Sequence, residues 1–419
     1  MALSPWLRGR LEQIVYVVAG LPIAVRGSAS APSPAARTIL EAYRRRYWHP
    51  ATVREGAELA IGIVLAPVLV PLAASWFTFR NGAVIRRREG KGIAAQFAEQ
   101  VRLYFSAGVL APWYYILSLH RDGARRAPTF LQRCETKRGI YALLSTQAVS
   151  PLGDKNAFAE RCSSAGVRCI ACELVVDGNG ADGSKLPDRD LFVKPLTGRG
   201  GRGAERWDRT APRRWTNGDK LVSDHELVEE LATRGRPMIV QKRCRPHPAL
   251  EPLTSGALPT VRALTIIDEQ GRPELVAAVF RMSIGANRTV DNIHAGGLAC
   301  RVSIEDGTLG LASNLGADDR LGWCSRHPTT GAEIEGTKLP YWPETRALAV
   351  QAHTAFDDRL LIGWDISILE DGPIVLEGNR GPDMDLMQRF METGFMTHRF
   401  GELIAWHLKL RGLVGPAGA

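Results

Sequence analysis

The sequence predicts an α+β fold of two lobes, in which mainly antiparallel sheets meet at a cleft, preceded by a helical N-terminal region. Short apolar runs that suit strands recur after residue 170. The helical patterns between them are fewer than a doubly wound parallel sheet would need. The last two runs, 363–369 and 374–379, flank the turn Glu370-Asp371-Gly372-Pro373 and are typical of a β-hairpin.

Spacing and composition place the individual elements. Strands are expected over 174–177, 191–194, 238–241, 261–267, 275–282, 299–304 and the two arms of the final hairpin. Helices are expected over 156–165, 224–234 and 343–358, and the apolar spacing between 93 and 120 is also helical. The predicted domains are a helical N-terminal region over 1–130 and a two-lobed domain over 131–419, with lobe one at about 150–238 and lobe two at about 239–412.

The final hairpin gathers oxygen atoms that could bind a cation. If the turn centres on Asp371, Asp365 and Glu377 face each other across the two strands, and Asn379 points to the same face as Glu377. Two carboxylates and an amide oxygen at one end of an apolar hairpin cost free energy unless a cation neutralises them. Such hard oxygen ligands suit Mg²⁺ that carries nucleotide phosphates. A surface hairpin with acidic ends is the alternative, which this segment alone does not exclude.

A glycine-rich loop follows the strand that ends in Lys194. Its glycines are Gly198, Gly200, Gly201 and Gly203. Their backbone amides can surround phosphate oxygens, while Lys194 supplies a positive charge. The alternative is a loop that is only flexible. No Gly-Lys-Ser or Gly-Lys-Thr closes the loop, so it is not a Walker loop.

Together these motifs resemble the ATP-grasp superfamily, and most of all its branch associated with sugar transfer and cell-surface polysaccharide genes, which is similar to α-L-glutamate ligases. The resemblance covers roughly residues 131–407. It depends on the order and spacing of 154–155, 192–203, 238–242, 259–262, 280–282, 292–297 and the hairpin residues above. In that superfamily two lobes hold ATP between them, and most members activate a carboxylate as an acyl phosphate before an amine or thiol attacks. The chief departure is the apparent lack of an N-terminal parallel α/β domain that helps to hold substrate.

The resemblance implies a role for each candidate residue. Lys155 and Lys194 would bind the α- and β-phosphates of ATP, and the loop 198–203 would cover the γ-phosphate. Backbone groups of Gln241, Lys242 and Arg243 would contact adenine. The metal ligands for Mg²⁺ would be Asp365, Glu377 and Asn379.

Four further residues are expected to act on the reacting groups. Arg262 and Arg281 lie on strands that should point into the cleft, where a guanidinium can neutralise the transferring phosphoryl group or clamp a carboxylate. Asn292 and His294 would contact substrate or phosphate, and His294 could also serve as a base. The alternatives are surface ion pairs for the arginines and a structural role for the histidine.

The function expected from these motifs is an ATP- and Mg²⁺-dependent ligase that joins a carboxylate to an amine through an acyl phosphate. Its substrates would be small molecules, sugar-linked ones among them, and its setting the modification of cell-surface polysaccharide or related metabolites. Two alternatives stay open: a kinase that stops after phosphorylating its acceptor, and a nucleotide-binding membrane scaffold without turnover. The intact trio of Asp365, Glu377 and Asn379 counts against the scaffold.

Composition limits the partners and the compartment. The net charge of +9 over 419 residues suits anionic ligands, nucleic acid or an acidic membrane surface. Because the arginines are scattered and not interleaved with aromatic residues, no nucleic acid partner is expected. Seven cysteines, an odd number, argue against a complete disulfide framework and favour a reducing compartment, the cytoplasm. Cys169 and Cys172 have no second ligand pair at metal-site spacing, and we expect them to be structural.

The N-terminal region contains an apolar run that is long enough to reach across a bilayer. Residues 59–79 carry no charge and are bracketed by arginines, which suit anionic headgroups. Pro67 and Pro71 should break a helix here, so we expect a peripheral or monotopic contact with the inner face of the membrane. The alternative is packing against Phe97, Tyr104 and Trp113. The shorter run 14–25 is expected to be an uncleaved helix that lies on the membrane.

Overall fold

The chain forms two compact units. The computed structural model describes residues 26–29, 31–146, 150–178, 180–181, 185–198, 201–285, 289–291, 293, 296–315 and 322–414. The helical unit comprises Met1–Ser145, Leu315–Gly322 and Asp383–Ala419, and the sheet unit comprises Thr146–Asn314 and Trp323–Pro382. The expected run 14–25 lies outside the described residues. The domain boundaries at 130/131 and 238/239 stay predictions, and residues 131–145 and 383–419 group with the N-terminal helices.

The helical unit joins the two ends of the chain. Its α-helices within the described residues are α2 (Pro34–Trp48), α3 (Val53–Glu89), α4 (Ile93–Ala107), α5 (Ala111–Ile116), α6 (Gly123–Arg126), α7 (Tyr141–Leu144), α11 (Met384–Met391) and α12 (Arg399–Leu410). Helix α2 begins where Ser33 accepts a hydrogen bond from the Ala36 amide and Pro34 occupies the first turn. Ser33 also donates to the Met396 carbonyl, 2.7 Å away, and α12 packs against α2. Sequence spacing alone did not predict α2, α11 or α12.

Helix α3 is continuous over 37 residues, so the expectation of a break at Pro67 and Pro71 is wrong. A proline has no N–H group to donate to the carbonyl four residues earlier. Pro67 therefore leaves the Ile63 carbonyl without its helical donor, and Pro71 leaves the Pro67 carbonyl without one. Ile63 and Pro67 are both exposed, so water can bond to the two carbonyls. The helix begins at the Thr52 cap and ends at Gly90, which has a left-handed backbone.

One side of α3 packs in the core of the helical unit and the other side is exposed. Ala66, Val70 and Phe77 share an apolar cluster with Tyr104 and Trp113. Of the three contacts expected for this run, Tyr104 and Trp113 are therefore in the cluster, while Phe97 is only half-buried and outside it. Within the described residues, α3 alone has the length and apolar composition to cross a membrane. These two properties by themselves are weak evidence for a span.

The sheet unit contains two seven-stranded sheets. The first has the order β2-β1-β7-β3-β4-β5-β6, and the second β12-β11-β10-β9-β8-β13-β14. The first sheet is built from β1 (Leu174–Asp177), β2 (Gly180–Ala181), β3 (Leu191–Pro195), β4 (Glu205–Ala211), β5 (Arg214–Thr216), β6 (Leu221–Ser223) and β7 (Met238–Lys242). The second is built from β8 (Thr260–Ile267), β9 (Pro273–Met282), β10 (Leu298–Val302), β11 (Leu309–Ser313), β12 (Trp323–Cys324), β13 (Leu361–Leu369) and β14 (Gly372–Asn379). Every pairing between these strands is antiparallel, and the predicted fold class is confirmed.

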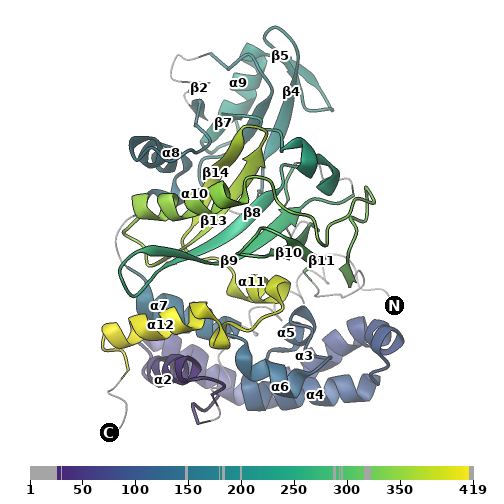
Figure 1. Ribbon diagram of the computed structural model, residues 1–419, viewed down its shortest axis with the longest axis vertical. Helices are drawn as coiled ribbons and strands as arrows, with labels where there is room; N and C mark the ends of the chain where they lie inside the picture. Colours follow the sequence, from purple (N-terminus) through teal and green to yellow (C-terminus); the bar gives the residue numbers. More distant parts are fainter. Residues whose placement is uncertain are drawn as a thin grey trace. The chain divides into compact units, whose positions relative to one another are not determined.

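Among the described residues, three α-helices accompany the sheets: α8 (Lys155–Ser164), α9 (Asp224–Ala232) and α10 (Trp342–Ala355). Helix α9 packs on the first sheet, where Leu227 and Leu231 join its apolar core. Helix α10 covers one face of the second sheet (Figure 1). There the His353 ring lies 2.7 Å from the Thr265 hydroxyl, to which Trp364 also donates at 2.8 Å. The opposite face of that sheet is left to carry the polar residues described below.

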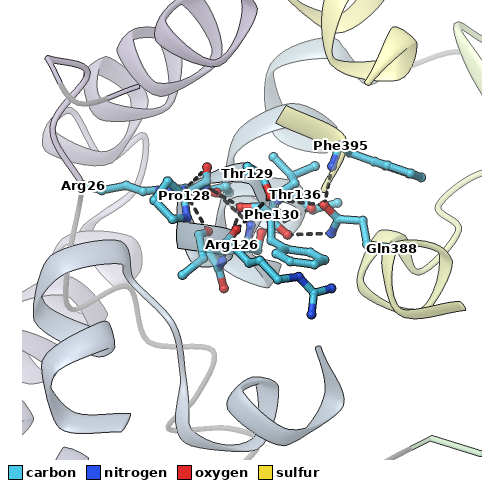
Figure 2. A network of polar contacts seen from close by, with 12 residues as sticks. Arg26, Arg126, Pro128, Thr129, Phe130, Thr136, Gln388 and Phe395 are labelled. Carbon is cyan, nitrogen blue, oxygen red and sulfur yellow. Dashed lines mark hydrogen bonds and ion pairs between the residues drawn. The ribbon is translucent and has the colours of Figure 1, made fainter. Parts of the chain in front are cut away.

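A network of buried polar contacts holds the helical unit together (Figure 2). The Arg26 guanidinium donates to both Glu135 carboxylate oxygens at 2.6 Å and to the carbonyls of Pro128 and Phe130. Gln388, on α11, accepts from the amides of Leu131 and Phe395, both at 2.8 Å. These contacts tie the segment 126–136 to both ends of the chain, which explains why residues 383–414 belong with the N-terminal helices.

Replacing Arg26 with alanine should lower the free energy of unfolding by about 3 to 5 kcal/mol, because Glu135 would stay buried without its cation. Guanidinium denaturation followed by tryptophan fluorescence measures the change. Arg54→Ala is the matched control, since it removes an exposed ion pair with Glu58 and should change stability little. An R26A protein as stable as the wild type would show that this ion pair does not hold the segment.

Candidate functional site

A bulge in the final hairpin brings two carboxylates opposite each other. The turn consists of Glu370 and Asp371, so Leu369 pairs with Gly372. The register then shifts by one residue between Ile366 and Asp365, and Asp365 pairs with Glu377. Without this shift Glu377 would point to the other face of the sheet. The expected pairing of Asp365 with Glu377 is present, but it results from the bulge and does not result from the position of the turn.

The paired residues belong to a row that crosses three strands. Arg262 on β8 lies opposite Asp365 on β13, which lies opposite Glu377 on β14. Arg281 on β9 lies opposite Thr260, two residues before Arg262. Since residues that are paired or two apart share a face, all five side chains lie on one face of the second sheet.

Two arginines neutralise Asp365. Arg262 contacts both carboxylate oxygens, with Nη2 3.1 Å from Oδ2. Arg281 places Nη2 3.1 Å from the same oxygen. Burial by itself would raise the pKa of Asp365, but the two guanidinium groups outweigh it and lower this pKa to about 2. Asp365 is therefore ionised at neutral pH.

Of the two facing carboxylates, Asp365 and Glu377, it is Glu377 whose ionised form is unfavourable. Burial raises its pKa, the neighbouring Asp365 raises it further, and Lys194 acts in the opposite direction. The expectation that the two carboxylates need a cation between them is therefore wrong for Asp365, because Arg262 and Arg281 already balance its charge.

The oxygen atoms present still suit Mg²⁺. In the described part of the chain no group of three or more His, Cys, Asp or Glu side chains could hold a metal. The predicted trio instead combines two carboxylates with the Asn379 amide, whose nitrogen lies 3.5 Å from a Glu377 oxygen. With the amide oxygen turned toward a cation, the three residues offer hard oxygen ligands and leave further positions for phosphate. Their metal role stays a prediction.

Two lysines from the first part of the sheet unit lie within electrostatic reach of Glu377. Lys194 is on β3, and Lys155 begins α8 and donates to the Leu196 carbonyl at 3.1 Å. Burial lowers the pKa of both lysines, and the Glu377 carboxylate opposes this shift in each case. The predicted lysines and the hairpin thus belong to one charged cluster, although their assignment to phosphates stays a prediction.

The glycine loop reaches the segment that follows β9. Gly198, Gly201 and Gly203 have φ values of +135°, +69° and +76°, which favour glycine. A Cβ on Gly201 would lie 2.6 Å from the Val290 Cγ1 atom, so a side chain there would clash. The predicted residues Gly200, Asn292 and His294 lie outside the described residues.

The predicted adenine contacts differ in what they can offer. Gln241 is buried, and its side chain donates to the Ala171 carbonyl at 3.3 Å. The Arg243 amide donates to the Asp190 carbonyl at 3.0 Å, so it is engaged within the sheet. The N–H and C=O groups of successive residues in a strand point to alternate sides. Those of Arg243 point toward β3, so those of Lys242 point to the opposite side, where β1 does not extend as far as Lys242. Lys242 is thus the best placed of the three.

Sequence reasoning missed Thr260 and Asp291 as parts of this cluster. Arg281 donates to the Thr260 hydroxyl, and its Nε lies 3.3 Å from Asp291 Oδ2. The signal for Thr260 was its position two residues before Arg262 on an expected strand. Asp291 lies outside the expected strands and helices, so no periodicity indicates which way its side chain points.

The profile of the sugar-transfer associated ATP-grasp family matches residues 142–400. D-cycloserine synthetase DcsG is 16% identical, over 61% of this chain and 71% of its own, with a TM-score of 0.36. D-alanine–D-alanine ligase from Bacillus anthracis, complexed with ATP, is 13% identical over 62% and 67%, with a TM-score of 0.35. L-amino acid ligase from Bacillus licheniformis is 12% identical over 62% of this chain and 51% of its own, with a TM-score of 0.34, so the match spans about half of that ligase. No curated sequence matches the chain.

The two carboxylates of the row should respond oppositely to neutralisation. Asp365→Asn should lower the free energy of unfolding by about 3 to 5 kcal/mol, because Arg262 would stay largely buried without a carboxylate and Arg281 would keep only Asp291. Glu377→Gln should instead raise stability at pH 8. The folded protein holds the Glu377 proton more tightly than the unfolded chain does, so wild-type stability falls as pH rises from the ordinary glutamate pKa through the raised one.

Denaturant unfolding between pH 5 and 8, without divalent cations, measures both effects. The E377Q protein should show a flatter pH dependence than the wild type. Asp188→Asn is the control for a lost Arg–Asp pair, since its pair with Arg209 is exposed and should matter little. Parallel pH profiles for E377Q and wild type would contradict the shift assigned to Glu377.

Proposed function

The chain belongs to the sugar-transfer associated ATP-grasp family, and we propose that it is an ATP- and Mg²⁺-dependent ligase that joins a small carboxylate to an amine. The observation that carries this proposal is the row of Arg262, Asp365 and Glu377 on one sheet face. Lys155 and Lys194 add positive charge within reach of Glu377. Such a cluster suits a polyanionic substrate bound with a cation.

The proposed reaction has two steps. A carboxylate oxygen of the substrate attacks the γ-phosphorus of ATP, which releases ADP and leaves an acyl phosphate. An amine nitrogen then attacks the acyl carbon, inorganic phosphate leaves, and the nitrogen loses a proton. Bound Mg²⁺ would neutralise charge on the phosphates during the first step. Most of the catalysis would come from positioning and charge neutralisation.

In our proposal, each group of residues has its own role. Asp365, Glu377 and Asn379 hold Mg²⁺, and Lys155 and Lys194 hold the phosphates together with amides of the loop 198–203. Arg262 and Arg281 stabilise the transferring phosphoryl group or orient the carboxylate.

The remaining proposed contacts complete the nucleotide and acceptor sites. The Lys242 backbone, flanked by Gln241 and Arg243, binds adenine. Asn292 and His294 contact the substrate.

The proposed substrates are sugar-linked carboxylates or amines in the cytoplasm, where ATP is available. Support for the sugar link comes from the description of the family. A kinase that stops at the phosphorylated acceptor is the second candidate function, since it would use the same charged row. A scaffold without turnover is less well supported, because the row keeps two carboxylates buried beside each other at an electrostatic cost.

Hydroxylamine separates the three functions. With ATP, Mg²⁺, hydroxylamine and a panel of amino acids and sugar acids, the ligase should release ADP and form a hydroxamate, because hydroxylamine traps an acyl phosphate. Lys194→Ala should weaken MgATP binding by about 1.5 to 3 kcal/mol and lower both products. ADP release without hydroxamate would favour the kinase, and no ADP release with any acid would favour the scaffold.

We also propose that α3 lies in the plane of an anionic membrane surface. Six of its exposed apolar residues recur at helical spacing, namely Ile61, Val64, Leu65, Val68, Leu72 and Phe79, whereas the exposed Ile63 lies off this side of the helix. At roughly 100° per residue they form one stripe, opposite the side that packs in the core. A helix with one side against protein and one side apolar suits an in-plane position better than a span. Arg86, Arg87 and Arg88 in its last turn suit anionic headgroups.

Charges placed in the stripe should abolish vesicle binding. The double variant Val68→Glu and Leu72→Glu should bind phosphatidylserine-containing vesicles at least about tenfold more weakly than the wild type, because each buried apolar side chain contributes about 1.5 to 3 kcal/mol. Flotation on a density gradient measures the bound fraction. Leu221→Glu, at an exposed apolar position of the sheet unit, is the matched control. A wild-type protein that neither floats with vesicles nor pellets with cell membranes would refute the proposal.

A further inference from the structure

We propose that Asp291, together with Thr260, is a positioning group that holds Arg281 in the charged row when Asp365 turns to another partner. The proposal deepens the proposed function and rests on it. It starts from an asymmetry between the two arginines. Both contact Asp365, but in the described part of the chain Arg262 forms an ion pair with Asp365 alone, whereas Arg281 has a second carboxylate.

Arg281 is held from two directions. Its Nη2 lies 3.1 Å from Asp365 Oδ2, and its Nε lies 3.3 Å from Asp291 Oδ2. The side chains of Arg281 and Asp291 are each 12% exposed, so water screens this pair weakly.

Thr260 links the second carboxylate to the arginine. Its hydroxyl donates its single hydrogen to Asp291 Oδ2. The hydroxyl oxygen accepts from Arg281 Nε at 3.0 Å and from Nη2 at 2.5 Å. With its hydrogen and lone pairs all used, the hydroxyl has one orientation, and it fixes Arg281 relative to Asp291.

This arrangement gives the two arginines different tasks. In the proposed function Asp365 becomes a metal ligand, and its oxygens can then no longer serve both guanidinium groups fully. Arg262 would lose its ion-pair partner and turn to an anionic substrate. Arg281 would stay in place, because Asp291 and Thr260 keep their contacts with it.

The neighbourhood of Asp291 supports a role beyond the stability of a loop. The preceding residue, Val290, is the one that the glycine loop approaches at Gly201. Asp291 therefore lies where the predicted phosphate loop meets the second sheet. If the pair of Arg281 and Asp291 only stabilised this segment, Arg281 would not also need to contact Asp365, a predicted metal ligand.

Asp291→Asn separates these roles. In the variant Arg281 is no longer shared, so it pairs fully with Asp365 and competes with a cation for that carboxylate. We expect Mn²⁺ to bind about tenfold more weakly, as measured by electron paramagnetic resonance of free Mn²⁺ with saturating ADP. Thr260→Val should shift the affinity in the same direction, and Thr260→Ser should restore the wild-type value. Asp188→Asn, which breaks an exposed Arg–Asp pair, should leave it unchanged.

The outcomes distinguish a failure of the proposed metal site from a failure of the positioning role. Wild-type protein that binds no Mn²⁺ with ADP would refute the metal site of the proposed function, and this inference with it. Normal wild-type binding and an unchanged affinity in D291N would overturn the positioning role alone, even if the variant were less stable. Should D291N fail to fold, T260V decides, since valine matches threonine in shape, and an unchanged Mn²⁺ affinity in it would overturn the role.

Discussion

The register of β13 against its two neighbours is the constraint on which the candidate site depends. It places Arg262, Asp365 and Glu377 in one row, and every electrostatic feature of the site follows from that row. A slip of one residue on either side would turn one of these side chains toward α10 and the apolar core, where a charge is costly. The bulge between Asp365 and Ile366 is therefore part of the site, because it alone brings Glu377 to the polar face.

The row explains why the site tolerates so many buried charges. Arg262 and Arg281 neutralise Asp365, Asp291 shares Arg281, and Lys194 partly offsets Glu377. Each carboxylate thus has a cation nearby, and among the described residues Arg281 is shared between Asp365 and Asp291 while Arg262 pairs with Asp365 alone. Because a buried cation is costly without a partner, the second carboxylate lets Arg281 stay in place if Asp365 takes another partner, whereas Arg262 would then need a new anion.

Sequence patterns predicted those parts of the molecule that depend on local rules. The antiparallel strands, the hairpin and Lys194 at the end of a buried strand follow from alternation and turn chemistry. The bulge escaped prediction because one extra residue changes the register without changing the apolar pattern. Asp291 escaped because it lies outside the expected strands and helices, where contacts depend on tertiary packing. The prolines predicted a break in α3, but the sequence does not show that the residues whose carbonyls lose a donor, Ile63 and Pro67, are exposed.

Glu377 shows how the fold and the proposed chemistry compete. Its raised pKa means that the folded chain keeps a carboxyl group where an ionised one is unfavourable. A well-packed apolar residue there would stabilise the hairpin more, but it would remove a ligand from the proposed metal site. A cation bound there would favour the ionised form of Glu377 and so oppose the rise of its pKa, which would make cation binding depend on pH. The strain is thus confined to one residue, while Asp365 beside it stays ionised and paired.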